Sequence, residues 1–330
     1  MERGVAAHPL IADSPFRRTD QARLDAAKFR DPLVTAKGEQ RAVAPMTGLT
    51  TLWFNTGTLC NLACATCYIE SSPRNDALVY LSAAEVAAYL DEAAAERLPV
   101  REVGFTGGEP FMNREAPALI ADTLSRGLEA LVLTNAMRPM RRFERELLAL
   151  RERYGARLTM RVSLDHHSRA VHEAERGAGT WDKALDGLRW LAREGFRLAV
   201  AGRALPGEAE TQARAGYAAL FAEHELPVDP ADPSRLVLFP EMDADADVPE
   251  ISEGCWSILN LSPASVMCAS SRMVVKRRGG ARPSVAACTL LPYDPGFDLG
   301  PTLAGAMRPV ALNHPHCAHF CVLGGASCSG

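Results

Sequence analysis

The stretch LCNLACATCYIE (residues 59–70) places three cysteines, Cys60, Cys64 and Cys67, within eight residues. No further cysteine occurs between residues 68 and 254, and the other six of the nine gather toward the end of the chain. They are Cys255, Cys268, Cys288, Cys317, Cys321 and Cys328. This distribution predicts two separate sites.

The composition excludes several classes of protein. The 330 residues carry 36 Lys and Arg against 40 Asp and Glu, a net charge of -4, so no basic surface for nucleic acid or an anionic membrane is expected. No apolar run has signal-peptide length or approaches the roughly 18 residues of a membrane span. We therefore expect a cytoplasmic protein, in which clustered cysteines more often bind metals or act in catalysis than form disulfides.

Six short apolar runs alternate with amphipathic helical segments. The runs cover residues 51–57, 101–107, 130–135, 157–165, 196–202 and 235–239. Helices are expected at residues 82–97, 114–126, 141–154, 180–195 and 209–224. Ser82 and Glu85 form a capping box at the start of the first helix. Six strand–helix units in series predict an α/β fold of parallel strands covered by helices, as an open or partial barrel.

The three early cysteines follow the first strand, where such folds place their active sites. A zinc site or a fully protein-ligated cluster needs a fourth ligand, and the local sequence holds no further Cys or His. A [4Fe-4S] cluster with one iron open to an exogenous ligand fits three thiolates, and Gly57 lets the loop turn closely. From spacing alone, three buried structural cysteines are the alternative.

Two motifs resemble those of a known protein family. CNLACATCY (residues 60–68) resembles the Cys-x3-Cys-x2-Cys signature of the radical S-adenosylmethionine (SAM) superfamily. VGFTGGEPFMN (residues 103–113) ends the second strand with GGEP, the element that in this family meets the amino group of the SAM methionine. The resemblance covers about residues 50–240. It implies a partial (β/α)6 barrel, a [4Fe-4S] cluster on Cys60, Cys64 and Cys67, and SAM bound at Gly107, Gly108, Glu109 and Pro110.

Weaker similarities follow at the later strand ends. VLTNAM (residues 132–137) resembles the family's turn after the third strand, and Ser163 lies where a serine commonly reaches the SAM ribose. Arg176 and Arg203 are candidates for the SAM carboxylate, because a guanidinium binds a carboxylate in two places. The family often has an aromatic residue where this chain has Thr66, so the adenine contact is expected to pass to Tyr68 or elsewhere.

Two neighbouring histidines, His166 and His167, follow the fourth strand. They are expected to point toward the cavity, as substrate contacts or in a capping or solvated role.

The end of the chain resembles the SPASM or twitch extension of radical SAM proteins. Residues 263–330 contain a hairpin that turns at Gly279 and Gly280, with Cys268 and Cys288 on either side. The resemblance implies one auxiliary [4Fe-4S] cluster held by Cys268, Cys288 and two of Cys317, Cys321 and Cys328. Cys255 is the odd member, and either it or a substrate atom could occupy a ligand position. His314, His316 and His319 lie among the last cysteines, so zinc is the alternative metal.

These assignments divide the chain into four parts. They are an N-terminal extension (1–47), the barrel (48–240), an acidic linker (241–262) and the cysteine-rich region (263–330). Residues 17–31 are expected to form a surface helix, and the linker to be solvated. The N-terminal extension is shorter than the separate leader-binding domain of many peptide-modifying relatives.

The resemblance implies an enzyme that takes an electron from a low-potential donor such as flavodoxin or ferredoxin. It would cleave SAM to methionine and a 5′-deoxyadenosyl radical, and abstract hydrogen from a substrate. Peptide or protein modification is the favoured reaction, and radical oxidation or rearrangement of a small metabolite or cofactor precursor is the alternative. A non-catalytic iron-sulfur or zinc redox sensor is the hypothesis from another class, but an intact GGEP beside an intact cysteine triplet argues against it.

Overall fold

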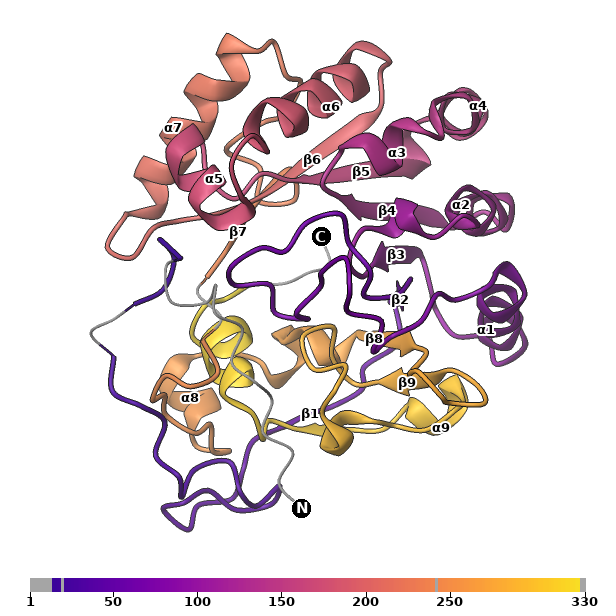
Figure 1. Ribbon diagram of the computed structural model, residues 1–330. Helices are drawn as coiled ribbons and strands as arrows, with labels where there is room; N and C mark the ends of the chain where they lie inside the picture. Colours follow the sequence, from indigo (N-terminus) through magenta and orange to yellow (C-terminus); the bar gives the residue numbers. More distant parts are fainter. Residues whose placement is uncertain (1–13, 19–20, 241–242, 327–330) are drawn as a thin grey trace.

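The computed structural model describes residues 14–18, 21–240 and 243–326, and its centre is a curved, mostly parallel sheet (Figure 1). The eight strands are ordered β7-β6-β5-β4-β3-β2-β8-β9. All six expected barrel strands are present: β2 (Thr51–Asn55), β3 (Glu102–Thr106), β4 (Glu129–Thr134), β5 (Leu158–Ser163), β6 (Arg197–Arg203) and β7 (Leu236–Phe239). Each pairs in parallel with the next, which confirms an unclosed (β/α)6 arrangement.

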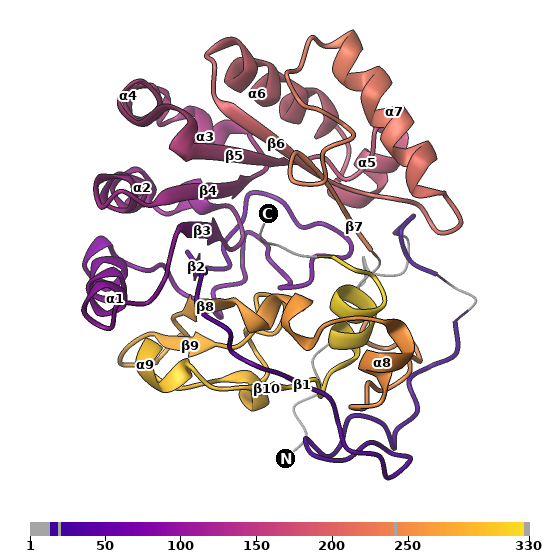
Figure 2. The ribbon, with the colours of Figure 1, turned by 180° about the vertical axis from the view of Figure 1, so that it is seen from behind.

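Helices cover the outer face of this sheet (Figures 1 and 2). The long helices are α1 (Ala83–Ala95), α2 (Ala116–Ser125), α4 (Glu144–Tyr154), α6 (Trp181–Arg193) and α7 (Glu210–Glu223), and the short ones are α3 (Arg138–Arg141) and α5 (Arg169–Arg176). The capping box predicted for the first helix is confirmed, since Ser82 and Glu85 exchange their side-chain to backbone hydrogen bonds. No helix in the described part of the chain is long and apolar enough to cross a membrane.

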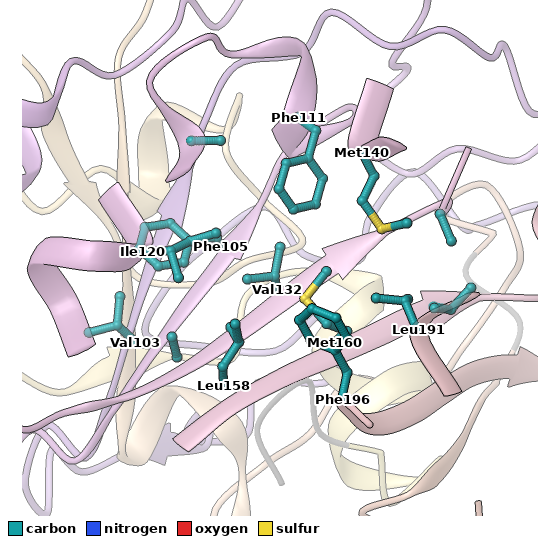
Figure 3. Close-up of a cluster of buried hydrophobic side chains, with 14 of the residues drawn as sticks. Val103, Phe105, Phe111, Ile120, Val132, Met140, Leu158, Met160, Leu191 and Phe196 are labelled. Atoms are coloured by element: carbon teal, nitrogen blue, oxygen red, sulfur yellow. The ribbon is translucent and has the colours of Figure 1, made fainter. Parts of the chain in front are cut away.

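The alternation of side chains along each strand separates two cores. On β2, Leu52 and Phe54 belong to the core between sheet and helices, whereas Trp53 belongs to a second core formed with the C-terminal region. Figure 3 shows part of the first core, with Val132 and Met160 packed on the helix side of their strands. Both faces of the central strands are therefore buried, as is usual for parallel sheets.

The C-terminal region extends the same sheet instead of forming a separate layer. The expected hairpin is present as β8 (Ser271–Val275) and β9 (Ser284–Ala286), which pair antiparallel. β8 also pairs in parallel with β2, next to the loop that carries the first cysteines. Short elements complete the region: α8 (Cys255–Leu259), α9 (Leu303–Ala306), a π-helix (Cys317–Val322), and β10 (Val310–Ala311), which pairs with β1 (Val43–Ala44).

The N-terminal segment differs from the expectation. Residues 21–31, within the segment expected to be a surface helix, form bends and turns, so that prediction is wrong for the described residues. Their polar groups bind the acidic segment instead: Lys28 Nζ lies 2.7 Å from Asp247 Oδ1, and the Phe29 amide donates to Glu250. Glu250 also binds Arg41 at 2.5 Å with both side chains buried, so this part of the acidic segment is docked rather than solvated.

Candidate active site

The loop after β2 carries Cys60, Cys64 and Cys67 between the barrel strands and the C-terminal region (Figures 1 and 2). The loop begins at Gly57, whose φ of +111° is in the range that favours glycine. A hydrogen bond from the Cys60 amide to the Ser72 carbonyl closes the loop on itself. The first strand thus delivers the cysteines to the carboxyl edge of the sheet, where parallel α/β folds place their sites.

The turn after β3 packs directly on the cysteine loop. The Gly108 amide donates to the Gly57 carbonyl at 2.8 Å, and the Glu109 amide donates to the Leu59 carbonyl at 3.2 Å. A Cβ atom on Gly108 would lie 2.3 Å from the Leu59 carbonyl oxygen, and one on Gly107 would lie 2.5 Å from that of Gly57. Both glycines are therefore required for this close approach of two backbones.

Nine of the predicted site residues meet around one cavity, which we call the barrel cavity. It is lined by Cys60, Cys64, Cys67, Tyr68, Gly107, Gly108, Ser163, Arg176 and Arg203. Further walls come from the strand ends Leu133 and Ala201, and from Leu290 and Phe320 of the C-terminal region. Residues that are up to 260 positions apart thus share one cavity.

The three thiols in this cavity are strongly buried. Burial raises the pKa of the Cys60 thiol to about 12, and it also raises the pKa values of Cys64 and Cys67. Without a cation the sulfurs would therefore stay protonated at neutral pH, whereas a bound metal cluster favours the thiolate form. Three thiols from one loop, in a cavity whose lining also carries polar side chains, fit a three-cysteine [4Fe-4S] cluster that keeps one iron open.

Glu109 and Pro110 lie beside the barrel cavity rather than on its wall. Pro110 is buried at the start of a short 3-10 helix. The Glu109 carboxylate accepts from Thr134 Oγ1 at 2.8 Å, from the Asn135 amide at 2.8 Å and from the Phe111 amide at 3.2 Å. A carboxylate has about four acceptor sites, so one is left for a ligand ammonium. Burial raises the pKa of Glu109 to about 7, although these donors favour the ionised form.

Arg176 enters the barrel cavity already paired with Asp165. Its Nε and Nη2 atoms donate to the Asp165 carboxylate at 2.6 and 2.9 Å. Burial alone would raise the pKa of Asp165, but the Arg176 guanidinium holds that pKa below its usual value. Two of the guanidinium nitrogens are occupied, and Nη1 has no hydrogen-bond partner among the described residues. Arg176 can therefore bind a second anion without giving up Asp165.

Arg203 belongs to a second buried network around Glu175. Its Nη1 donates to Thr66 Oγ1 at 2.6 Å, and Glu175 accepts from the Thr66 amide at 2.8 Å and from the Thr66 hydroxyl at 2.7 Å. Phe16 lies under the guanidinium, 4.2 Å from its carbon to the ring centroid. Ser14 donates to the other oxygen of Glu175 at 2.6 Å. Thr66, which replaces the family's aromatic residue, thus ties the cysteine loop to α5 and β6.

Comparison with known proteins agrees with this geometry. Residues 54–214 match the family model of the radical SAM superfamily. This chain contains a radical SAM domain. Proteins of that superfamily use a [4Fe-4S] cluster and SAM, and residues 54–214 include the cysteine loop, the GGEP turn and both cavity arginines.

Two curated relatives share this domain. Fe-coproporphyrin III synthase of Methanosarcina barkeri is 32% identical over 143 residues, which cover 42% of this chain and 33% of that protein. The antilisterial bacteriocin subtilosin biosynthesis protein AlbA of Bacillus subtilis is 29% identical over 143 residues, covering 43% and 30%. The match therefore spans about a third of the length of these relatives.

A solved structure shares the fold beyond the radical SAM domain. Streptococcus suis SuiB bound to S-adenosylmethionine matches with a TM-score of 0.55 at 12% identity, covering 77% of this chain and 63% of that chain. At this identity the similarity concerns the fold.

The structure does not bring His166 and His167 to the cavity of the radical SAM domain. Their ring centroids lie 4.0 Å apart with the ring planes tilted by 31°, and each Nε2 lies 3.4 Å from a carboxylate oxygen of Glu208. His166 Nδ1 accepts from the Ser168 amide, so a neutral His166 carries its proton on Nε2 and donates it to Glu208. Both side chains are held by these bonds, and neither lines the barrel cavity, contrary to the sequence-based expectation.

Four cysteines of the C-terminal region meet at a second, smaller cavity beside the radical SAM domain. This auxiliary cavity is lined by Cys268, Cys288, Cys317, Cys321 and His316, together with apolar side chains. The π-helix presents Cys317 and Cys321 on one side, since residues four to five apart align where hydrogen bonds run from i to i+5. Leu290 lines both cavities, so a single side chain separates them at that point.

The remaining cysteines are placed differently. Cys255 lies outside the auxiliary cavity, and its sulfur accepts from the Ser252 amide at 3.4 Å. Cys328, a candidate ligand from the sequence, lies outside the described residues. His314 and His319 do not line the auxiliary cavity.

Sequence reasoning missed Asp165 and Glu175 as site residues of the radical SAM domain. Both are acidic residues at buried positions, 8% and 2% exposed, next to residues that were singled out. Asp165 lies two residues after the end of β5, and this position is a detectable signal for a site residue. Glu175 has no such signal, because its partners Ser14, Thr66 and Arg203 are distant in the sequence.

Proposed function

We propose that this chain is a radical SAM enzyme that cleaves SAM reductively and abstracts hydrogen from a substrate. The observation that carries the proposal is the convergence of the three cysteines, the two glycines and two arginines on the barrel cavity. A [4Fe-4S] cluster held by Cys60, Cys64 and Cys67 would supply one electron for the reductive cleavage of SAM at its S–C5′ bond. This would give methionine and a 5′-deoxyadenosyl radical, which would take a hydrogen atom from the substrate. The electron comes from a low-potential donor such as flavodoxin or ferredoxin in the cytoplasm.

The residues of the chain bind and orient the reactants. Cys60, Cys64 and Cys67 hold three irons, and the backbone at Gly107 and Gly108 approaches the ligand without side chains. The free Nη1 of Arg176 binds the SAM carboxylate. Arg203 is a second candidate for that carboxylate because its Nε and Nη2 make no hydrogen bonds among the described residues. Ser163, at the end of β5, contacts the ribose, and Tyr68 contacts the adenine.

The auxiliary cavity holds a second [4Fe-4S] cluster, in a region of the SPASM or twitch type. Its four cysteines supply a complete ligand set. Zinc fits less well. A tetrahedral zinc site with Zn–S bonds of about 2.3 Å needs sulfur atoms about 3.8 Å apart, which is closer than three of these cysteine sulfurs come to one another in the described residues. In residues 14–18, 21–240 and 243–326, only His166, His167 and Glu208 bring three ligand atoms within 4.8 Å of one another.

The substrate is a peptide or protein that would bind at the barrel cavity. Support comes from the relative that is named for bacteriocin biosynthesis. The barrel cavity is partly lined by apolar side chains, which suit a hydrophobic side chain of a substrate: Leu133, Phe239, Leu290 and Phe320. A small metabolite or cofactor precursor is the second candidate, because another relative is named Fe-coproporphyrin III synthase.

Anaerobic reconstitution with iron and sulfide tests the proposal. We expect 5′-deoxyadenosine after addition of dithionite and SAM to the wild type, and none from Cys64→Ala. Cys255→Ala is the matched control, since Cys255 lies outside both cavities, and it should retain the activity. A fully iron-loaded wild type that leaves SAM intact, with and without candidate peptides, would favour the redox-sensor hypothesis instead.

A further inference from the structure

Arg272 on β8 is a fully buried cation beside the auxiliary cavity. Its side chain donates four hydrogen bonds, all to backbone carbonyls: those of Ala306, Cys268, Ser271 and Arg308, at 3.0, 2.6, 2.7 and 2.7 Å. The residue is 1% exposed. Burial lowers the pKa of Arg272 to about 10, so the guanidinium still carries its charge at neutral pH.

Arg272 lacks the carboxylate partner that Arg41, Arg176 and Arg203 have. Arg41 pairs with Glu250, Arg176 with Asp165 and Arg203 with Glu175, but no salt bridge joins Arg272 to an acidic residue in the part of the chain that is described. An isolated buried charge is costly unless an opposite charge lies near it. The ionisable groups that favour the charged form of Arg272 are the thiols of Cys268 and Cys288, two of the cysteines that line the auxiliary cavity.

A second polar group near this cavity is also unpaired. His316 lines the cavity with the four cysteines, and its side chain is 7% exposed. Its Nδ1 atom is buried and has no hydrogen-bond partner among the residues that the structure describes. Most buried polar atoms in native proteins are hydrogen-bonded, so a buried atom without a partner at the wall of a cavity points to a group that occupies the cavity.

We propose that Arg272 and His316 raise the reduction potential of the auxiliary cluster, Arg272 by its charge and His316 by an N–H···S hydrogen bond. This inference rests on the auxiliary cluster of the proposed function. Four thiolates give such a cluster a net negative charge, and reduction adds one more electron. A buried cation stabilises the reduced form more than the oxidised form, and so does a hydrogen bond to a ligand or bridging sulfur.

A purely structural role for Arg272 makes a different prediction. Its four hydrogen bonds hold the loop at Cys268 against the turn at Ala306–Arg308, so its loss would loosen the region whatever fills the cavity. A loosened site loses iron, whereas a missing charge shifts the potential of a fully loaded cluster. Arg272→Lys keeps the charge with fewer hydrogen bonds, and Arg272→Met removes both. His316→Phe removes a ring whose Nδ1 makes no hydrogen bond to the described residues.

The experiment isolates the auxiliary cluster by replacing Cys60, Cys64 and Cys67 with alanine in the full chain. After anaerobic reconstitution this variant should hold four irons, and its cluster is titrated by electron paramagnetic resonance against solution potential. At the midpoint potential of the background variant, Arg272→Met should lower the ratio of reduced to oxidised cluster about tenfold, equal to about 59 mV for one electron. His316→Phe should lower that ratio roughly threefold, and Arg272→Lys should restore most of the Arg272→Met loss.

Unchanged potentials in fully loaded Arg272→Met and His316→Phe would overturn the inference. If Arg272→Met fails to bind iron, His316→Phe and Arg272→Lys still test the inference. An unchanged reduction potential in His316→Phe would contradict it. A shift in Arg272→Lys as large as the shift expected for Arg272→Met would also contradict it. No cluster at all in the background variant would remove the auxiliary cluster itself. The wild-type assay for 5′-deoxyadenosine separates that result from a failure of the proposed radical SAM activity.

Discussion

Replacing Gly108 with alanine should disable the barrel cavity while the chain remains folded. The new Cβ would lie 2.3 Å from the Leu59 carbonyl oxygen and 2.8 Å from that of Thr58, whereas ordinary contacts begin at 3.4 Å. Both obstacles are backbone atoms, so either the cysteine loop or the GGEP turn must move by about 1 Å. Leu59 directly precedes Cys60, and a displacement of about 1 Å at a reacting centre costs about 100-fold in rate.

The assay is the initial rate of 5′-deoxyadenosine formation in Gly108→Ala, normalised to iron. We expect a loss of about 100-fold, with a stability loss of about 1–3 kcal/mol from the overpacked loop. Gly254→Ala is the matched control, since its Cβ would meet only Ser252 Oγ at 3.8 Å, and it should keep the wild-type rate. A Gly108→Ala protein with wild-type rate and iron content would refute the reasoning that the close packing of the two loops sets the site.

Three further predictions address charge, pH and ligand identity. The pKa of Glu109 in the folded protein, about 7, lies above the ordinary carboxyl value of 4.5. Glu109 therefore contributes on the order of 3 kcal/mol to the free energy of unfolding below pH 4.5. This contribution is lost as the pH rises through 7. Urea unfolding of the cluster-free protein should show this loss, and Glu109→Gln should abolish it. Asp165→Asn should destabilise the fold by about 3–5 kcal/mol, since it leaves Arg176 buried without its partner; a change below 1 kcal/mol in urea unfolding would contradict this. Iron analysis should give about four irons per chain for Cys268→Ala and about eight for Cys255→Ala, and eight in both would exclude Cys268 as a ligand.

Local signals predicted the barrel well. The alternation of apolar runs and helical segments predicted all six parallel strands, and the Ser82–Glu85 capping box predicted the start of α1. The Cys-x3-Cys-x2-Cys spacing and GGEP located most of the barrel cavity, because both motifs lie on loops directly after their strands. The strands, the capping box and the two motifs each depend on residues that are close together along the chain, so they can be predicted from a single sequence.

The features that sequence reasoning missed depend on partners far along the chain. Residues 21–31 have a composition compatible with a helix, but the Asp25 and Phe29 amides donate hydrogen bonds to Asp247 and Glu250, more than 200 positions away, and these bonds hold the segment in turns. The parallel pairing of β8 with β2 joins positions about 220 residues apart, so the C-terminal region completes the sheet of the barrel. His166 was expected at the cavity from its place after β5, and its bond to Glu208 holds it elsewhere.

The central claim is that three thiolates leave one iron of the cluster free to bind SAM. The most direct test is electron paramagnetic resonance of the reduced cluster before and after addition of SAM, in Cys268→Ala so that the auxiliary cluster does not contribute. We predict that SAM changes the spectrum and that methionine alone changes it less. A spectrum that stays the same at saturating SAM, in a protein with four irons per chain, would contradict the account.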